Sequence, residues 1–118
     1  MKKKSSTSPT KRTLDLCRKH GWTVQVVERW CSFSRKRVDL FGVVDVVAMD
    51  GKNVIGIQST SGSNFSSRMT KILAEPRAKL WIASGGRLFV HGWRQLAGKR
   101  KWECREEEVT SEMFTVAN

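Results

Sequence analysis

A single carboxylate interrupts the most strand-like stretch of the chain. Residues 41–48 read FGVVDVVA, and Asp45 stands among apolar neighbours on both sides. Such a run predicts a strand that is apolar on both faces, which is typical of the centre of a sheet. An unpaired ionised Asp is very costly there. Asp45 therefore needs a cation, a metal or a set of hydrogen-bond donors as its partner.

The residues that follow predict a hairpin. The Asp-Gly pair at 50–51 lies between two strand-like runs, which is the strongest short-range hairpin signal, so residues 41–48 are expected to pair antiparallel with residues 53–60. A two-residue loop places Asp45 opposite Gly56, whereas a four-residue loop places it opposite Gln58.

Both loop lengths put the same polar side chains beside the carboxylate. Gln58 and Thr60 share the face of Asp45 because side chains alternate along a strand. Gly56 is expected to leave open space on that face. The simplest alternative is that Gln58 and Thr60 mark only the point where a strand leaves the core, and that Asp45 forms an ion pair with an arginine such as Arg37.

An Asp on one strand, with an acid or amide and a further polar residue two positions later on the next, resembles the PD-(D/E)XK nuclease superfamily. The resemblance spans about residues 13–93 in the order and type of elements. The segments RVDLFG (37–42) and QSTSGSN (58–64) look like small phage-type relatives of archaeal Holliday-junction resolvases. The resemblance implies an α/β, restriction-endonuclease-like fold, with a mixed central sheet flanked by helices in the order α-β-β-β-α-β-β.

The resemblance also implies a metal site. Asp45, the side-chain oxygen of Gln58 and the backbone carbonyl of Ser59 would hold Mg²⁺ or Mn²⁺. A neutral amide is a poorer ligand for a hard cation than a carboxylate, so weak metal affinity is expected. Glu28 and Asp39 are either auxiliary acids of this site or exposed charges.

The lysine of the superfamily pattern falls on Thr60, which is neither a cation nor a good general base. Arg68 and Lys71, on the helix expected to follow, are the natural substitutes, because some members place the basic residue there. The same two residues, together with the run Arg35, Lys36 and Arg37, are candidates for binding DNA phosphates. The alternative for the run is a solvated charged face.

Charge favours a polyanionic partner. The 118 residues carry 22 Lys and Arg against 11 Asp and Glu, a net charge of +11. Nucleic acid is the commonest partner of such a chain. The size predicts one domain at residues 10–110, between a disordered basic tail at 1–9 and a C-terminal tail at 111–118.

Compartment and assembly are less constrained. No run of about 18 apolar residues and no signal peptide is present, which predicts a cytoplasmic protein of a bacterial or archaeal host or of a phage. Three cysteines without a close pair are expected to be reduced thiols. The sequence leaves the oligomeric state undecided, and a homodimer is one alternative.

Periodicity and turn residues predict the remaining elements. Trp22, Trp30, Trp81 and Trp93 fall in expected strands and are assigned to the core, as is His91. The expected elements are a helix at 10–20, a strand at 22–30, a basic connection at 31–38, a helix at 65–74, a hairpin of strands 78–83 and 87–93, and a strand at 102–107.

Together these features favour a metal-dependent DNA endonuclease, of the branched-DNA or Holliday-junction resolvase type. A catalytically degenerate nuclease fold that only binds DNA is the main alternative, because the Glu and Lys of the superfamily pattern are replaced. A basic structural or inhibitory protein that binds a protein partner is a third.

Overall fold

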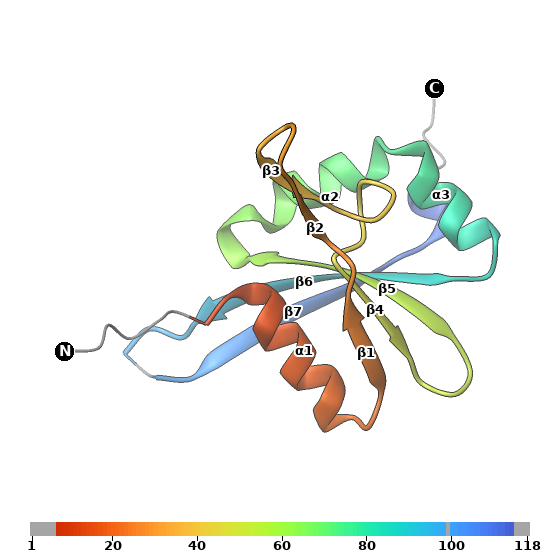
Figure 1. Cartoon of the computed structure of the whole chain (residues 1–118). Coiled ribbons are helices and arrows are strands. Elements are labelled where there is room, and N and C mark those ends of the chain that lie inside the picture. Colours follow the sequence, from red (N-terminus) through yellow and green to blue (C-terminus); the bar gives the residue numbers. More distant parts are fainter. Residues whose placement is uncertain (1–6, 99, 115–118) are drawn as a thin grey trace.

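The computed structural model describes residues 7–98 and 100–114. Within them the chain forms a mixed five-stranded sheet with helices on both faces and a separate two-stranded hairpin (Figure 1). The helices are α1 (Pro9–Lys19), α2 (Phe65–Leu73) and α3 (Pro76–Ala83), with 3-10 turns η1 (Gly62–Asn64) and η2 (Ser111–Phe114). The strands are β1 (Thr23–Val26), β2 (Arg29–Cys31), β3 (Lys36–Val38), β4 (Val46–Met49), β5 (Val54–Ser61), β6 (Arg87–Gln95) and β7 (Trp102–Val109).

The sheet has the order β1-β4-β5-β6-β7, so β5 is its central strand. Only β5 and β6 are parallel, and the other neighbours pair antiparallel. A parallel pair requires a crossover connection, which α2 and α3 supply. An α/β fold with a mixed sheet is therefore confirmed.

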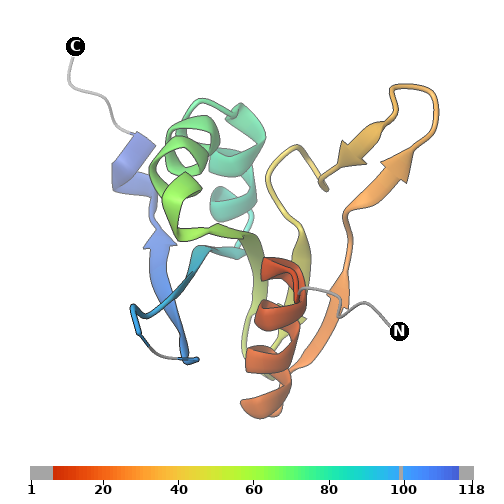
Figure 2. The same ribbon diagram turned by 90° about the vertical axis from the view of Figure 1, so that its left-hand side faces the viewer.

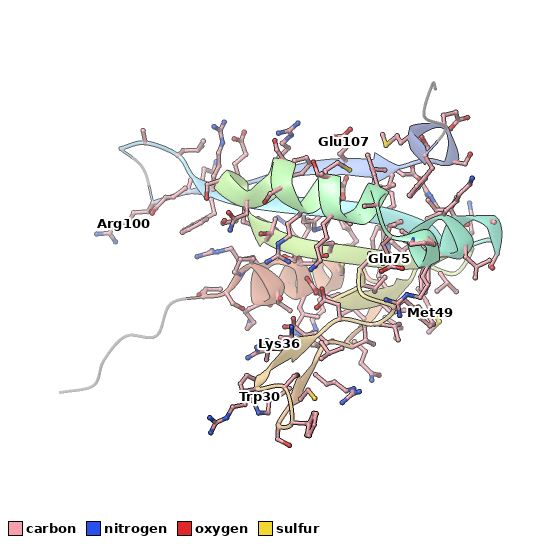
Figure 3. All side chains as sticks on the ribbon, turned by 90° about the horizontal axis from the view of Figure 1, so that it is seen from above. Trp30, Lys36, Met49, Glu75, Arg100 and Glu107 are labelled. Atoms are coloured by element: carbon pink, nitrogen blue, oxygen red, sulfur yellow. The ribbon has the colours of Figure 1, made fainter. Side chains whose placement is uncertain are left out.

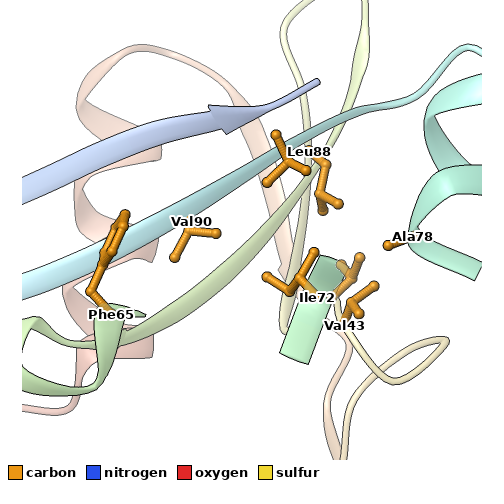
Figure 4. Close-up of a cluster of buried hydrophobic side chains, with 8 residues drawn as sticks. Val43, Phe65, Ile72, Ala78, Leu88 and Val90 are labelled. Carbon is orange, nitrogen blue, oxygen red and sulfur yellow. The ribbon is translucent and has the colours of Figure 1, made fainter. Parts of the chain in front are cut away.

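Each face of the sheet has its own core. On one face α1 packs through Cys17 and Leu14 against Ile55 and Ile57 of β5. On the other face the crossover helices contribute Phe65, Ile72 and Ala78, which pack around Leu88 and Val90 of β6 (Figure 4). The apolar side chains of β5, Ile55 and Ile57, thus belong to the core on the α1 face, and the alternate positions Gly56 and Gln58 face the other side.

The hairpin of β2 and β3 projects beyond the edge of the sheet (Figure 2). Two sequence predictions are wrong here. The expected strand at 22–30 divides, because the amides of Val27 and Glu28 turn to the carbonyl of Asp45 and β2 then pairs with β3. The basic connection at 31–38 is the turn and second strand of that hairpin.

The run around Asp45 is shorter as a strand than predicted. Residues 41–43 form a turn in which Phe41 and Gly42 have φ of 54° and 77°. Asp45 therefore directly precedes β4 and does not lie in the middle of a strand. The loop of the following hairpin has four residues, since Met49 pairs with Val54.

The predicted hairpin of strands 78–83 and 87–93 is also wrong, because residues 76–83 form α3. The side chain of Glu75 accepts the amide of Arg77, and Pro76 takes the first helical position, where its missing N–H costs nothing. Proline thus starts a second helix here, and β6 pairs with β5 instead.

Both chain ends differ slightly from prediction. Ser8 caps α1 by accepting the amide of Lys11, so the helix includes Pro9, which had been assigned to the tail. Residues 1–6 and 115–118 of the predicted tails lie outside the described residues. Met113 and Phe114 of η2 pack against the core that contains α2 and α3, so residues 111–114 belong to the domain. No helix in the described part of the chain is long and apolar enough to cross a membrane.

The packing of α3 on the sheet can be tested at Gly56. A Cβ at this position would meet Val44 at 2.9 Å and the Trp81 ring at 3.0 Å. Gly56→Ala should lower the free energy of unfolding by about 1–3 kcal/mol, because the core is already filled. Urea unfolding measures it. Val54→Ala, at a half-exposed site of the same strand, is the control, and an equal loss in both variants would contradict this packing.

Candidate metal centre

Asp45 is held by its backbone at the point where three segments meet. Its amide donates to the carbonyl of Ile57 (2.9 Å), and its own carbonyl accepts from the amides of Val27 (2.8 Å) and Glu28 (3.2 Å). The residue is only 3% exposed. The chain leading into β4 therefore anchors both β5 and the start of the hairpin at one residue.

The carboxylate contacts Gln58, one of its two predicted neighbours, and a backbone amide that the sequence did not indicate. Its Oδ2 accepts from the side-chain amide of Gln58 at 2.7 Å and from the backbone amide of Ser59 at 2.9 Å. Space beside Gly56, expected to be open, is instead filled by Val44 and Trp81. The polar site therefore lies at the Gln58 end of β5.

Two further acids join Asp45. Carboxylate oxygens of Glu28, Asp39 and Asp45 all lie within 4.8 Å of one another. The amide of Gln58 also donates to Asp39 at 3.3 Å. Glu28 and Asp39 are partly buried beside Asp45, so they are not simply exposed charges.

The position of these two acids follows from the hairpin. Glu28 directly precedes β2 and Asp39 directly follows β3, so strand pairing brings them together. A sequence signal for this existed in the residues around 31–38, had they been read as a hairpin. We name Glu28, Asp39, Asp45 and Gln58 the acidic cluster.

Arg37 contacts the cluster, but not at Asp45. Its guanidinium donates to Glu28 at 3.1 Å. The ion pair of Asp45 with Arg37, which was the simplest alternative, is therefore wrong. Among the described residues, Arg37 is the one Lys or Arg that forms an ion pair with a carboxylate of the cluster.

Burial sets the protonation of Asp45. Burial, which contributes most, and the neighbouring Asp39 together raise the pKa of its carboxyl to about 8, against the opposing effect of the amides of Ser59 and Gln58. At neutral pH without a cation, Asp45 is mostly protonated. A cation between the carboxylates would displace that proton, because it stabilises the ionised form.

Gln58 carries an unsatisfied polar atom. Its side chain is fully buried, and its Oε1 has no hydrogen-bond partner among the described residues. Its Nε2 donates to the two aspartates of the cluster. Rotation of the amide by half a turn exchanges the two atoms, so the same side chain can either donate to carboxylates or present an oxygen to a cation.

The other predicted site residues lie close in the chain but do not contact the acids. Thr60 is buried on the same face as Gln58. Arg68 is half-buried and Lys71 is exposed, both on α2. No hydrogen bond or ion pair joins any of these three to the cluster within residues 7–98 and 100–114.

Ser59 contacts Asp45 through its backbone and Thr13 of α1 through its side chain. Its amide donates to Asp45, and its carbonyl is directed to the same side of β5, because both groups of a strand residue face the same neighbour. Its hydroxyl points to the opposite face, 2.9 Å from the hydroxyl of Thr13 on α1. The backbone of Ser59 is thus available to the cluster, as the resemblance implies, while its side chain is not.

His91 is a core histidine, as predicted. Its Nδ1 lies 3.0 Å from the hydroxyl of Thr13, and its Nε2 lies 2.8 Å from Glu106. The indole of Trp93 also donates to Thr13, at 3.0 Å. Burial lowers the pKa of His91, and Glu106 opposes the shift. This network on the α1 face fixes β5 and β6 from behind the candidate site.

Two of the tryptophan predictions change. Trp81 lies on α3, where it packs over Gly56 and Gly86. Trp30 is 60% exposed on the projecting hairpin and is not part of the core.

Comparisons with protein-family models, curated proteins and solved structures gave no match. The interpretation of the site therefore rests on its own geometry.

The raised pKa of Asp45 predicts how stability depends on pH. In the unfolded chain Asp45 ionises near 3.8, whereas in the fold it ionises near 8. Folding therefore takes up a proton between these values, and the contribution of Asp45 to stability, full at low pH, is lost as pH rises to about 8. Asp45→Asn imitates the protonated form. Its free energy of unfolding, relative to the parent, should grow by a few kcal/mol between about pH 5 and about pH 9.

Urea unfolding in EDTA across that range measures the difference. Asp15→Asn, at an exposed carboxylate of α1, is the control and should show no such growth. A variant that loses stability equally at every pH would mean that Asp45 is ionised in the metal-free fold.

Proposed function

We propose that this protein is a metal-dependent DNA endonuclease and that the acidic cluster holds the metal. The observation that carries the proposal is the burial of Asp45 beside two other carboxylates and the unpaired Oε1 of Gln58. A cation between these carboxylates would stabilise the ionised cluster, which otherwise has one arginine as its counter-charge among the described residues.

The donor set fits Mg²⁺ or Mn²⁺. Hard divalent cations take oxygen ligands, and the cluster offers carboxylates from three segments with one amide oxygen. Arg37 supplies one positive charge against three acids, so a divalent ion would bring the local charge to neutrality. The Ser59 carbonyl is a further candidate ligand. No sulfur or imidazole lies in the cluster, which disfavours zinc.

A divalent ion bound here would polarise a phosphodiester oxygen and lower the pKa of a water molecule. The chain contributes the positioning. Asp45 and Asp39 orient toward one point, and the Ser59 amide keeps the Asp45 carboxylate from rotating. Arg37, exposed on one side and bonded to Glu28 on the other, lies where it can contact a phosphate.

The substrate is proposed to be DNA, because the net charge of +11 favours a polyanion. The hairpin concentrates part of that charge beside the acids. A branched DNA, such as a four-way junction, is the proposed substrate by resemblance. The second candidate is a DNA-binding protein without catalysis, favoured by Gln58 and Thr60 in place of an acid and a lysine.

Metal binding is the first requirement of the proposed endonuclease, and cleavage then separates the two candidates. Mn²⁺ at about 100 times its Kd should stabilise the parent by about 2.7 kcal/mol, on the order of 10 °C in melting temperature. Asp45→Asn should gain little stability from Mn²⁺, because the substitution replaces the main carboxylate ligand by a neutral amide. Gln58→Glu should gain more than the parent, since a carboxylate binds hard cations better than an amide. Thermal melts with and without Mn²⁺ measure these shifts.

Cleavage of linear, flapped and four-way DNA should follow the same order, with Asp45→Asn inactive but still able to bind DNA. Glu112→Gln, on η2 and away from the cluster residues, is the matched control. Equal melting temperatures with and without Mn²⁺ for the parent and for Gln58→Glu would remove the metal site. A metal shift without cleavage would favour the second candidate.

The missing lysine predicts a role for α2. If Arg68 or Lys71 stabilises charge at the reacting phosphate, then Arg68→Ala or Lys71→Ala should lower the cleavage rate by about 10- to 100-fold and DNA affinity by much less. Single-turnover rates and anisotropy titrations measure the two effects. Lys79→Ala on α3 controls for the loss of one exposed cation. Full activity in both variants would leave Arg37 as the cation at the site.

A further inference from the structure

The β2–β3 hairpin combines exposed aromatic rings with a high density of positive charge. Residues 29–38 contain four basic residues and no acidic one. Phe33, in the turn, is 98% exposed, and Trp30 is 60% exposed. Figure 3 places Trp30 and Lys36 on this hairpin, at the side of the molecule away from α3. Neither ring packs in the cores described above.

Exposed apolar side chains are ordinary when they stand alone. Here two aromatic rings stand within four residues, on a hairpin of three residue pairs. Trp30 lies directly across the strands from Arg37, so its ring and that guanidinium share a face. The combination of flat rings with adjacent cations is what proteins use to bind nucleic-acid strands with unstacked bases.

The turn of the hairpin holds an arginine in a backbone conformation that non-glycine residues rarely adopt. Arg35 has φ of 58°, in the left-handed region where Gly or Asn is favoured. Its amide closes the turn by donating to the carbonyl of Cys31 at 2.7 Å. An Arg in this conformation is less stable than Gly, so the turn itself does not require this side chain.

The hairpin is connected to the acidic cluster at both ends, through Glu28 and Asp39. Phe33 is five residues from Glu28. At about 3.3 Å per strand residue, these five residues span roughly 16 Å of backbone. That length corresponds to about five nucleotides of a DNA strand.

We propose that the hairpin recognises DNA with an unstacked base, with Phe33 and Trp30 stacking on exposed bases at a break in the duplex and Arg35 and Lys36 binding the flanking phosphates. The inference rests on the proposed function, since it names the feature of DNA that brings a strand to the acidic cluster. The charge of the hairpin favours DNA as the ligand, because the charged residues of the hairpin are all basic. A bound cation would allow the neighbouring acids to lie beside a phosphate.

The experiment uses the full chain in EDTA, so that binding is measured without metal or cleavage. Two fluorescent DNAs are compared by anisotropy, a continuous duplex and the same duplex with a two-nucleotide gap. The parent should bind the gapped DNA more tightly by about 5- to 150-fold, the range for stacking one base. Phe33→Ala and Trp30→Ala should each remove most of this preference and change duplex affinity by less than about 2-fold.

The variants are chosen so that the protein still folds. Phe33 is almost fully exposed, so its removal leaves the cores intact. Phe33→Trp should restore the preference. Arg35→Gly should weaken binding to both DNAs while the melting temperature stays level or rises, because glycine relieves the turn. Leu80→Ala, at an exposed apolar site on α3, is the control and should behave as the parent.

Three results would overturn the inference. They are equal affinity of the parent for both DNAs, equal loss on both DNAs in Phe33→Ala, and loss in Phe33→Ala of binding to anionic lipid vesicles with gap preference intact. Its failure is distinguishable from that of the proposed function, which is decided by Mn²⁺ melts and cleavage. If both hold, cleavage should map about five nucleotides from the gap.

Discussion

Most of the candidate site depends on how Asp45 is bonded. Its backbone joins β5 to the start of the projecting hairpin, and its carboxylate accepts hydrogen bonds from two consecutive residues of β5. These bonds compensate part of the cost of burial, but they do not supply a positive charge. The fold therefore favours the neutral carboxyl of Asp45, because burial raises its pKa to about 8. Under the proposed function, a cation would favour the ionised form of the same residue.

The central strand separates structural from functional side chains. On one face of β5, the Ser59 hydroxyl bonds to Thr13, and Thr13 also bonds to His91 and Trp93 of the neighbouring strand β6. On the other face, Gln58 meets the acids. The α1 face is a fully bonded polar network, whereas the cluster face holds an unpaired amide oxygen. A site of this kind can change its ligands without disturbing α1, because the two networks share only the backbone of β5.

The sequence predicts the local part of this site and not the tertiary part. Asp45, Gln58 and Thr60 share a face because of the two-residue period of strands, and a four-residue loop was one of the two registers considered. Glu28 and Asp39 were named, but their meeting depends on a hairpin that an Arg-rich segment did not suggest. The sequence predicts a strand at 78–83, where the structure has helix α3, although Pro76 stands where proline commonly begins a helix. Trp30 was assigned to the core from its strand propensity, which does not report which sheet a strand joins.

The burial of Asp45 also bears on the kinetics of folding. The residues beside it, Val43 and Val44, pack in the core formed by α2, α3 and the parallel strand β6. Strands β4 and β5 are neighbours in the chain, whereas β5 and β6 meet only after a crossover of about 25 residues closes, which is slow by comparison. Val43 and Val44 are therefore covered when the crossover helices dock and not when the β4–β5 hairpin forms, so the segment that carries Asp45 completes its packing late in folding.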